Sequence, residues 1–168
     1  SVYDAVIMNH VLEHVQAPIE FLSEVKKHLK RDGCILIAVP NIRCFESALP
    51  GWNSYEPYHL SYFDSDSLQS VIEKSGLSII YSGSYESFSG WFLAALRTIL
   101  GFNKGDVTTV SQIDRPEVAR GKRKGIVDFI YRCVSLVFGY SITPFRWMQS
   151  RLGRGDELFF LVRNDQGF

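Results

Sequence analysis

The first half of the chain alternates short apolar runs with segments in which apolar residues recur at helical spacing. Ala5 to Met8 form the first run, Cys34 to Val39 form the second, and Leu77 to Ser82 form a later one. Continuous apolar runs of this length are typical of strands that are covered on both faces, as in a parallel sheet. The pattern therefore predicts that these runs are strands of one sheet.

A helix is predicted between the first two strands. Pro18 suits the first position of a helix, and Leu22, Val25 and Leu29 follow it at helical spacing. Gly33 is the residue expected to end this helix. A strand, a helix and a second strand in this order form a βαβ unit, whose crossover is right-handed in nearly all proteins.

A second helix is predicted after a long polar and aromatic loop, residues 41–63. Asp64 or Ser65 is expected to cap this helix and Gly76 to end it. Its buried face is expected to consist of Leu68, Val71 and Ile72. Because the loop is longer than a simple connection requires, we expect it to be functional.

Residues 85–155 follow a different pattern. The stretches 89–102 and 126–140 are rich in aromatic and aliphatic residues on more than one face, and a basic linker separates them. Charged residues interrupt both stretches, and neither reaches the roughly 18 to 20 apolar residues that a membrane-spanning helix needs. We therefore expect a helical insertion or cap here, followed by a last strand from Glu157 to Val162.

The composition is that of one globular domain, since 46% of the 168 residues are apolar and 21% are charged. Eighteen basic residues balance eighteen acidic ones, so no overall field attracts nucleic acid. The basic linker also lacks interleaved aromatic residues on which bases could stack, and we expect no nucleic-acid partner. Three scattered cysteines without metal-site spacing, together with an N-terminus that lacks a secretory signal, favour a cytoplasmic protein.

Four stretches, in their order along the chain, resemble the C-terminal half of class I S-adenosylmethionine-dependent methyltransferases, in the broad group of ubiquinone-type and glycan-cluster enzymes. They are YDAVIMNHVLEHVQAP, FLSEVKKHLKRDGCILIAVPN, YHLSYFDSDSLQSVIEKSGLSII and GRGDELFFLVRN. The resemblance implies a Rossmann-like α/β fold whose sheet has the strand order 3-2-1-4-5-7-6, with the last strand antiparallel. This chain would supply the fourth to seventh strands.

The resemblance also implies a division of the chain. Residues 1–84 would form the C-terminal part of the methyltransferase core, 85–155 the helical insertion or cap, and 156–168 the final strand and tail. The glycine-rich loop that wraps the cofactor, and the acidic residue that holds its ribose, would precede residue 1. The N-terminal cofactor-binding half is thus expected to be absent from this chain.

S-adenosylmethionine is the cofactor that the resemblance implies. Asn9, His10 and Val11 match the positions after the fourth strand that line its adenine and methionine portions. A physical argument points to the same edge, because ligands of open α/β sheets bind outside the carboxyl ends of the strands. Here those ends carry residues 9–14 and 40–63.

A metal site is the alternative interpretation of His10, Glu13 and His14, which form the pattern H-x-x-E-H of inverted zinc proteases. That site requires both histidines on one face of a helix, whereas a predicted strand and Pro18 leave room for barely two helical turns. Some ubiquinone-type relatives bind a divalent ion through E-x-x-E-H at this place, but here histidine occupies the first position. We therefore predict no metal site, with these three residues as the alternative.

His59 is the candidate catalytic residue, because a histidine in the functional loop can accept a proton as the methyl group arrives. The alternative is that His59 only joins the loop to the next helix. Asn41, Trp52, Tyr55 and Tyr58 are the candidate acceptor-binding residues. Methyl transfer itself requires mainly alignment of an already activated cofactor with the acceptor.

The sequence thus predicts methyl transfer to an oxygen or nitrogen atom of a small-molecule, glycan or lipid-linked acceptor. The rival hypothesis is a non-catalytic interaction or dimerisation domain, because an unpaired fourth strand would be an exposed edge. Two alternatives stay open for the insertion. Its aromatic residues pack within a subdomain or a homodimer, or they make peripheral contact with a membrane.

Overall fold

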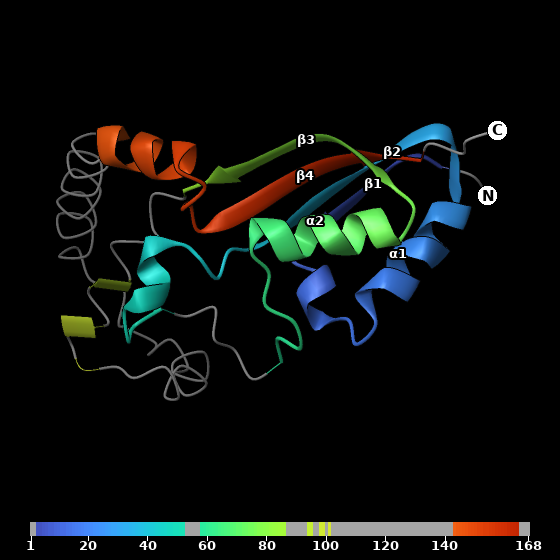
Figure 1. The fold of residues 1–168 in the computed structure, drawn as a ribbon. Coiled ribbons are helices and arrows are strands. Elements are labelled where there is room, and N and C mark those ends of the chain that lie inside the picture. The colour runs from blue at the N-terminus through green and yellow to red at the C-terminus, as the bar shows by residue number, and fades with distance from the viewer. Residues whose placement is uncertain are drawn as a thin grey trace, which may run out of the picture.

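The computed structural model describes residues 3–52, 58–86, 94–95, 98–99, 101 and 143–164. Within these residues the fold is a mixed α/β sheet with helices packed on one face (Figure 1). The strands are β1 (Tyr3–Asn9), β2 (Leu29–Pro40), β3 (Ser78–Tyr85) and β4 (Glu157–Arg163). The helices are α1 (Pro18–Lys27) and α2 (Ser65–Lys74), with short 3-10 turns η1 (Leu12–His14) and η2 (Phe45–Ala48). Residues 143–151 are also helical.

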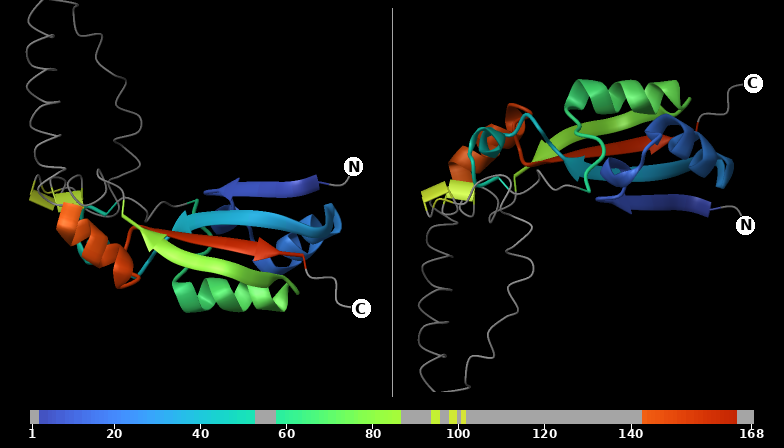
Figure 2. Two further views of the ribbon diagram at one scale, coloured as in Figure 1. Left: turned by 90° about the horizontal axis from the view of Figure 1, so that it is seen from above. Right: turned by 90° about the horizontal axis from the view of Figure 1, so that it is seen from below.

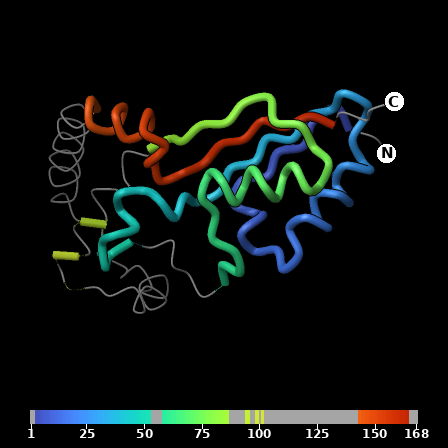
Figure 3. The backbone as a smooth tube through the Cα atoms, viewed as in Figure 1, coloured from blue at the N-terminus to red at the C-terminus, as the bar shows by residue number. Residues whose placement is uncertain are grey.

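The four strands pair in the order β1-β2-β4-β3. β1 and β2 are parallel, whereas β4 runs antiparallel to both of its neighbours, β2 and β3. The predicted parallel βαβ unit and the predicted antiparallel last strand are therefore confirmed. The path of the backbone in Figure 3 shows how the last strand enters the sheet between β2 and β3.

Both α1 and α2 cover the same face of the sheet (Figures 1 and 2). Leu22 from α1 and Leu68 and Ile72 from α2 are fully buried against the inward side chains of the strands. Alternation along β2 supplies Ile35 and Ile37 to this core, because successive side chains of a strand point to opposite faces. The core thus holds β1, β2 and β4 at fixed relative positions.

The predicted end of the first helix was wrong. The helix ends at Lys27, and Leu29 begins β2 instead of continuing the apolar stripe. Leu29 pairs with Tyr3 of β1 and is buried. An apolar residue at this position is therefore compatible with a buried strand as well as with the buried face of a helix. The register of β1 with β2 then shifts, and Asp32 has a φ of 63° within the irregular segment before Gly33.

The second helix has the predicted cap. The Asp64 carboxylate accepts a hydrogen bond of 2.8 Å from the Ser67 backbone N–H, and the Ser67 hydroxyl accepts one from the Asp64 backbone N–H. Gly76 follows the helix with a φ of 74°, a conformation in which glycine is favoured. Asp64 therefore determines where the loop 58–63 joins the helix, and Gly76 marks where the chain turns toward β3.

The predicted helices at 89–102 and 126–140 lie almost entirely outside the described residues. Of the predicted insertion, 85–155, the structure describes mainly residues 143–155, of which 143–151 are helical. Among the helices that the structure does describe, none is both long and apolar enough to cross a membrane.

Candidate functional site

The carboxyl ends of β1, β2 and β3 meet the amino end of β4 at one edge of the sheet. Pro40 and Tyr85 both pair with Glu157, the first residue of β4. Just beyond the strands, the His10 backbone N–H donates to the Ala38 carbonyl over 3.0 Å, and the Asn41 N–H donates to the Asp156 carbonyl over 2.8 Å. The edge that the sequence predicted as the ligand side is therefore formed.

His10 lies at this edge between two carboxylates. Its Nδ1 is 3.1 Å from Glu13 Oε1, and its Nε2 is 2.7 Å from Glu157 Oε1. These hydrogen bonds, first to Glu13 and then to Glu157, raise the pKa of His10 to about 10. The ring is therefore an imidazolium at neutral pH, with both N–H groups donating, and about half of it is exposed.

A positive φ of 52° at His10 turns the chain sharply after β1. Asn9 and His10 stay exposed as a result, and Val11 is 37% exposed. The next residue, Leu12, is fully buried and anchors the turn in the core. The three residues expected to line the cofactor thus share one accessible turn at the carboxyl edge.

Glu13 joins this turn to the aromatic loop. Its side chain is only 1% exposed, and its backbone carbonyl accepts hydrogen bonds from the N–H groups of Leu60 and Ser61 over 2.8 and 3.1 Å. Burial opposes ionisation of Glu13, but the hydrogen bond from His10 and the nearby charges outweigh it and lower the pKa of this carboxyl. Glu13 is therefore an ionised, buried link between residues 9–15 and 58–63.

His59 belongs to a group of rings in the aromatic loop. Its ring centroid is 4.8 Å from that of His14, 5.5 Å from that of Tyr58 and 6.2 Å from that of Tyr62. His14 Nδ1 is 3.1 Å from the Tyr58 carbonyl, which fixes the orientation of the His14 ring. The predicted catalytic histidine thus lies beside the turn that follows β1.

The H-x-x-E-H residues do not have the geometry of a zinc protease. Only residues 12–14 are helical, as one 3-10 turn, and His10 precedes that turn. Both ring nitrogens of His10 already contact carboxylates. A different set, Glu13, His14 and His59, brings one ligand atom from each residue to within 4.8 Å of the others. Among the described residues, His59 therefore replaces His10 in the group that could hold a metal ion.

The predicted acceptor-binding residues differ in their burial and contacts. Asn41 is 1% exposed, and its amide donates to the carbonyls of Gly153 and Gly155 over 3.0 and 2.7 Å. The Asn41 amide thus joins β2 to the segment before β4, and its contact with an acceptor stays a prediction. Trp52 is buried at 3% exposure, Tyr58 is 56% exposed, and Tyr55 lies outside the described residues.

A buried polar cluster beside the edge was not predicted. Glu46 of η2, Glu86 after β3 and Gln149 of the segment 143–151 are each at most 1% exposed. The Gln149 amide nitrogen lies within 3.0 Å of carboxylate oxygens of both glutamates. The sequence contains no signal for this cluster, because the three residues are far apart along the chain. Only the fold brings their segments together.

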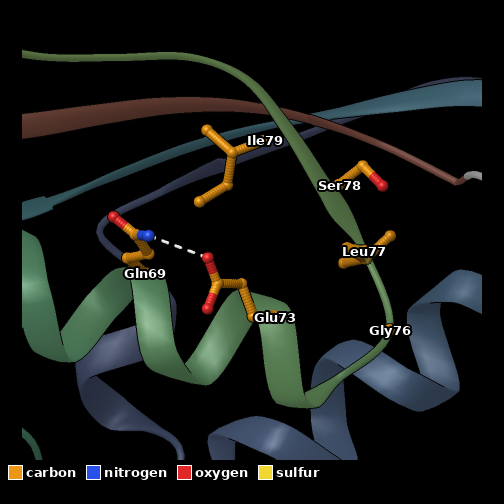
Figure 4. Close-up of a pocket in the computed structure, with 6 residues that line it drawn as sticks. All are labelled: Gln69, Glu73, Gly76, Leu77, Ser78 and Ile79. Carbon is orange, nitrogen blue, oxygen red and sulfur yellow. Dashed lines mark hydrogen bonds between the residues drawn. The ribbon is translucent and has the colours of Figure 1, made fainter.

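A shallow depression lies at the other edge of the sheet (Figure 4). It is lined by residues of α2 and the start of β3, namely Gln69, Glu73, Gly76, Leu77, Ser78 and Ile79. Because it adjoins the amino end of β3, it is remote from the strand ends that carry His10 and Asn41. We therefore do not assign it to the candidate site.

Comparisons with known proteins agree with this fold. Residues 1–82 match the family model described as a methyltransferase domain. No curated protein matches the chain. Among solved structures, a SAM dependent methyltransferase from Archaeoglobus fulgidus is 17% identical with a TM-score of 0.50, and the alignment covers 96% of this chain and 59% of that one.

Two further solved structures match at lower scores. The [4+2]-cyclase SpnF is 12% identical with a TM-score of 0.48, covering 99% of this chain and 51% of that one. A structure from Galdieria sulphuraria, described as a sarcosine dimethylglycine methyltransferase, is 14% identical with a TM-score of 0.47. The alignment covers 99% of this chain and 54% of that one. This chain therefore spans little more than half the length of these structures. Residues 1–82 thus match a methyltransferase domain over just under half of the chain, and the fold of the chain is similar to part of the Archaeoglobus fulgidus structure.

Proposed function

We propose that this chain takes part in S-adenosylmethionine-dependent methyl transfer to an oxygen or nitrogen atom of a small-molecule, glycan or lipid-linked acceptor. The observation that carries the proposal is the match of residues 1–82 to a methyltransferase domain, combined with an accessible turn at the carboxyl edge of the sheet. In this proposal β1, β2, β3 and β4 correspond to the fourth, fifth, sixth and seventh strands of the complete sheet. Residues outside this chain supply the first half of the cofactor site.

Asn9, His10 and Val11 are the residues that we assign to the cofactor. The Asn9 amide is a polar group at the exposed end of β1, and Val11 offers an apolar surface beside it. Both N–H groups of the half-exposed His10 imidazolium donate to Glu13 and Glu157, so we assign it a contact through its ring and not a hydrogen bond to the cofactor. This surface fits a ligand that has both polar and apolar parts. When bound, S-adenosylmethionine supplies an activated methyl group, so the chain has to align the acceptor and exclude water.

His59 is the residue that we assign to proton removal from the acceptor. The aromatic loop holds it next to His14, and its backbone neighbours Leu60 and Ser61 are tied to Glu13. Tyr58 is exposed beside it and could contact the acceptor. A general base must come within hydrogen-bond distance of the acceptor atom, and the closeness of the His59 and His14 rings supports this assignment if residues 9–11 bind the cofactor.

Isothermal titration with S-adenosylmethionine tests the cofactor assignment. The titration should compare this chain with a longer protein that includes its natural upstream sequence. We expect the longer protein to bind S-adenosylmethionine and N9A to weaken this binding. H28A should leave the binding unchanged, because His28 lies at the amino ends of β1 and β2, away from the carboxyl edge. A longer protein that fails to bind S-adenosylmethionine would contradict the proposal.

Turnover of His59→Ala in the longer protein tests the base. We expect kcat to fall by roughly a hundredfold or more, the usual contribution of a general base, with little change in cofactor affinity. Unchanged turnover at saturating acceptor would remove His59 from the chemistry. His28→Ala is again the matched control, because its side chain is 59% exposed at the surface.

A non-catalytic interaction domain is the second candidate. It is favoured by one observation, which is that β1 forms an edge of the described sheet and exposes Ile7 at 74%. An unpaired edge strand is a template for pairing with another chain, including a second copy. Dimerisation in light scattering, together with a longer protein that does not bind S-adenosylmethionine, would favour this candidate over the enzyme.

A further inference from the structure

The helical segment 143–151 packs against the rest of the protein through its polar side. Gln149 is fully buried, with its amide nitrogen in the Glu46 and Glu86 cluster. Ser150 accepts a hydrogen bond of 2.9 Å at its carbonyl from the Ser84 hydroxyl. Arg146 donates to the Glu86 carbonyl over 2.7 Å. This polarity is the reverse of the usual arrangement, in which a surface helix buries its apolar stripe.

The apolar residues of the same segment face outward. Trp147 is 62% exposed, Met148 43% and Phe145 38%, and Leu152, just after the helix, is 60% exposed. Phe45 of η2 stacks on Phe145 with ring centroids 6.1 Å apart and is itself 38% exposed. We refer to these five side chains as the outer apolar patch. From their exposed fractions and side-chain areas of about 150–250 Å², the patch presents roughly 500 Å².

A patch of this size is expected to have a function. The largest apolar patch on a typical soluble protein is about 300–600 Å² and is often functional. A standard protein–protein interface buries about 800 Å² on each partner, which is more than this patch offers. The area is therefore small for a stable contact with a second copy, but a helix can enter a lipid interface through a surface of this extent.

The charged residues of the helical segment and its C-terminal end are all positive. Residues 143–154 contain Arg146, Arg151 and Arg154 and no acidic residue. The Arg151 guanidinium lies 4.8 Å from the centroid of the Trp147 ring, so cation and aromatic ring are presented together. Tryptophan with arginine suits a lipid interface, where the ring lies among the headgroups and the guanidinium reaches a phosphate.

A small hollow beside the helix adds hydrogen-bond donors. It lies between β3 and the helix, and its lining includes Ser82, Ser150, Trp147 and Arg151. Ser84 also lines it, but the Ser84 hydroxyl already donates to the Ser150 carbonyl. Hydroxyl and guanidinium groups are the donors that a phosphate accepts. The apolar patch is thus bordered by a polar surface of the chemistry that a lipid headgroup requires.

We propose that the outer apolar patch docks this protein on an anionic lipid membrane. Trp147, Met148 and Leu152 enter the boundary between headgroups and acyl chains, and Arg151 and Arg154 pair with lipid phosphates. The buried cluster around Gln149 holds the helix in the orientation that turns its apolar side outward. The proposal concerns a surface distinct from His10 and His59, and it stands independently of the proposed methyl transfer.

Vesicle flotation of the full 168-residue chain tests the proposal. The vesicles are phosphatidylcholine alone and phosphatidylcholine mixed with phosphatidylserine. We expect binding to the mixed vesicles that weakens as salt is added. Trp147→Ala should lower the partition coefficient roughly tenfold through lost apolar contact, and Arg151→Gln about fivefold on mixed vesicles only.

Matched control variants distinguish binding through the outer apolar patch from nonspecific binding of the protein to vesicles. Ile7→Ala removes another exposed apolar side chain, and Lys27→Gln removes another exposed cation. Both should bind vesicles as the wild type does. All variants change exposed positions, and circular dichroism confirms that each is folded before flotation.

Three outcomes would overturn the proposal. The first is no binding to mixed vesicles, and the second is vesicle binding that Trp147→Ala leaves unchanged. The third is a dimer in light scattering that Trp147→Ala converts to a monomer, because the patch would then be a contact between two copies of the chain.

Discussion

Replacing Glu86 with glutamine is expected to reduce the dependence of stability on pH. Glu86 is buried, and its Oε2 accepts hydrogen bonds from the Gln149 amide and from the Asp156 backbone N–H, at 2.9 and 3.0 Å. Burial, followed by the negative charges of Asp156 and Glu46, raises the pKa of Glu86 to about 9. A glutamine has the shape of the protonated acid and can accept the same hydrogen bonds through its carbonyl oxygen.

The sign of the effect follows from proton counting. An unfolded chain releases the Glu86 proton near the ordinary carboxyl pKa of 4.5, whereas the folded chain keeps it until about pH 9. Between these values the folded state holds more protons, so the free energy of unfolding falls as pH rises. One proton contributes at most about 1.4 kcal/mol per pH unit, which is up to about 2.7 kcal/mol between pH 6 and pH 8.

Urea unfolding at pH 6, 7 and 8 measures this effect. The wild type should lose stability over this range, and Glu86→Gln should lose less, by up to the amount of one proton. Contributions from other titrating groups cancel when the two slopes are subtracted. Glu73→Gln, at an exposed position on α2, is the matched control and should keep the wild-type slope. Equal slopes for the wild type and Glu86→Gln would refute the reasoning.

Three further predictions concern individual contacts. Glu157→Gln should lower the pKa of His10 by about one unit or more, because it removes one of the two carboxylates that contact the ring. NMR titration with His28 as the internal reference measures this shift, and an unchanged pKa of His10 would contradict the assignment. Asp64→Ala should lower the free energy of unfolding by about 1 kcal/mol through loss of the α2 cap, whereas the exposed Asp66→Ala should change it little, and equal losses would count against the cap. Ile37→Ala should lower the free energy of unfolding by about 2–5 kcal/mol, because the Ile37 side chain is fully buried. Ile80→Ala, on the exposed face, should lower it by less than about 1 kcal/mol, and equal losses for the two variants would contradict the assignment of Ile37 to the core.

Local features of the fold could be predicted because each rests on residues that are close in sequence. Asp64 and Gly76 bound α2 through contacts within a few residues of each other. The apolar runs predicted the positions of β1 and β2 because a run is a local signal, although one face of β1 is exposed in the described structure, with Ile7 74% exposed. Leu29 was misplaced because its apolar side chain suits a helix and a strand equally, and only pairing with Tyr3 decides between them.

Contacts between distant segments could not be predicted in the same way. His10 and Glu157 are 147 positions apart, and Glu46 and Gln149 are 103 apart. No periodicity links such pairs, because the order of strands in the sheet creates the proximity. The sequence therefore located the carboxyl edge and His10, but it missed the carboxylates that keep His10 charged and the commitment of the Asn41 amide to the backbone.

The central position of β4 has a consequence for synthesis. Among the described strands, β4 comes last along the chain, yet it is the one that connects the β1–β2 pair to β3. Residues 157–163 must therefore be synthesised before β3 can join the sheet, and the carboxyl edge cannot be complete until then. A chain that terminates upstream of Glu157 would leave β3 without its partner strand in the described sheet, and such an incompletely folded chain is a target for chaperones and proteases.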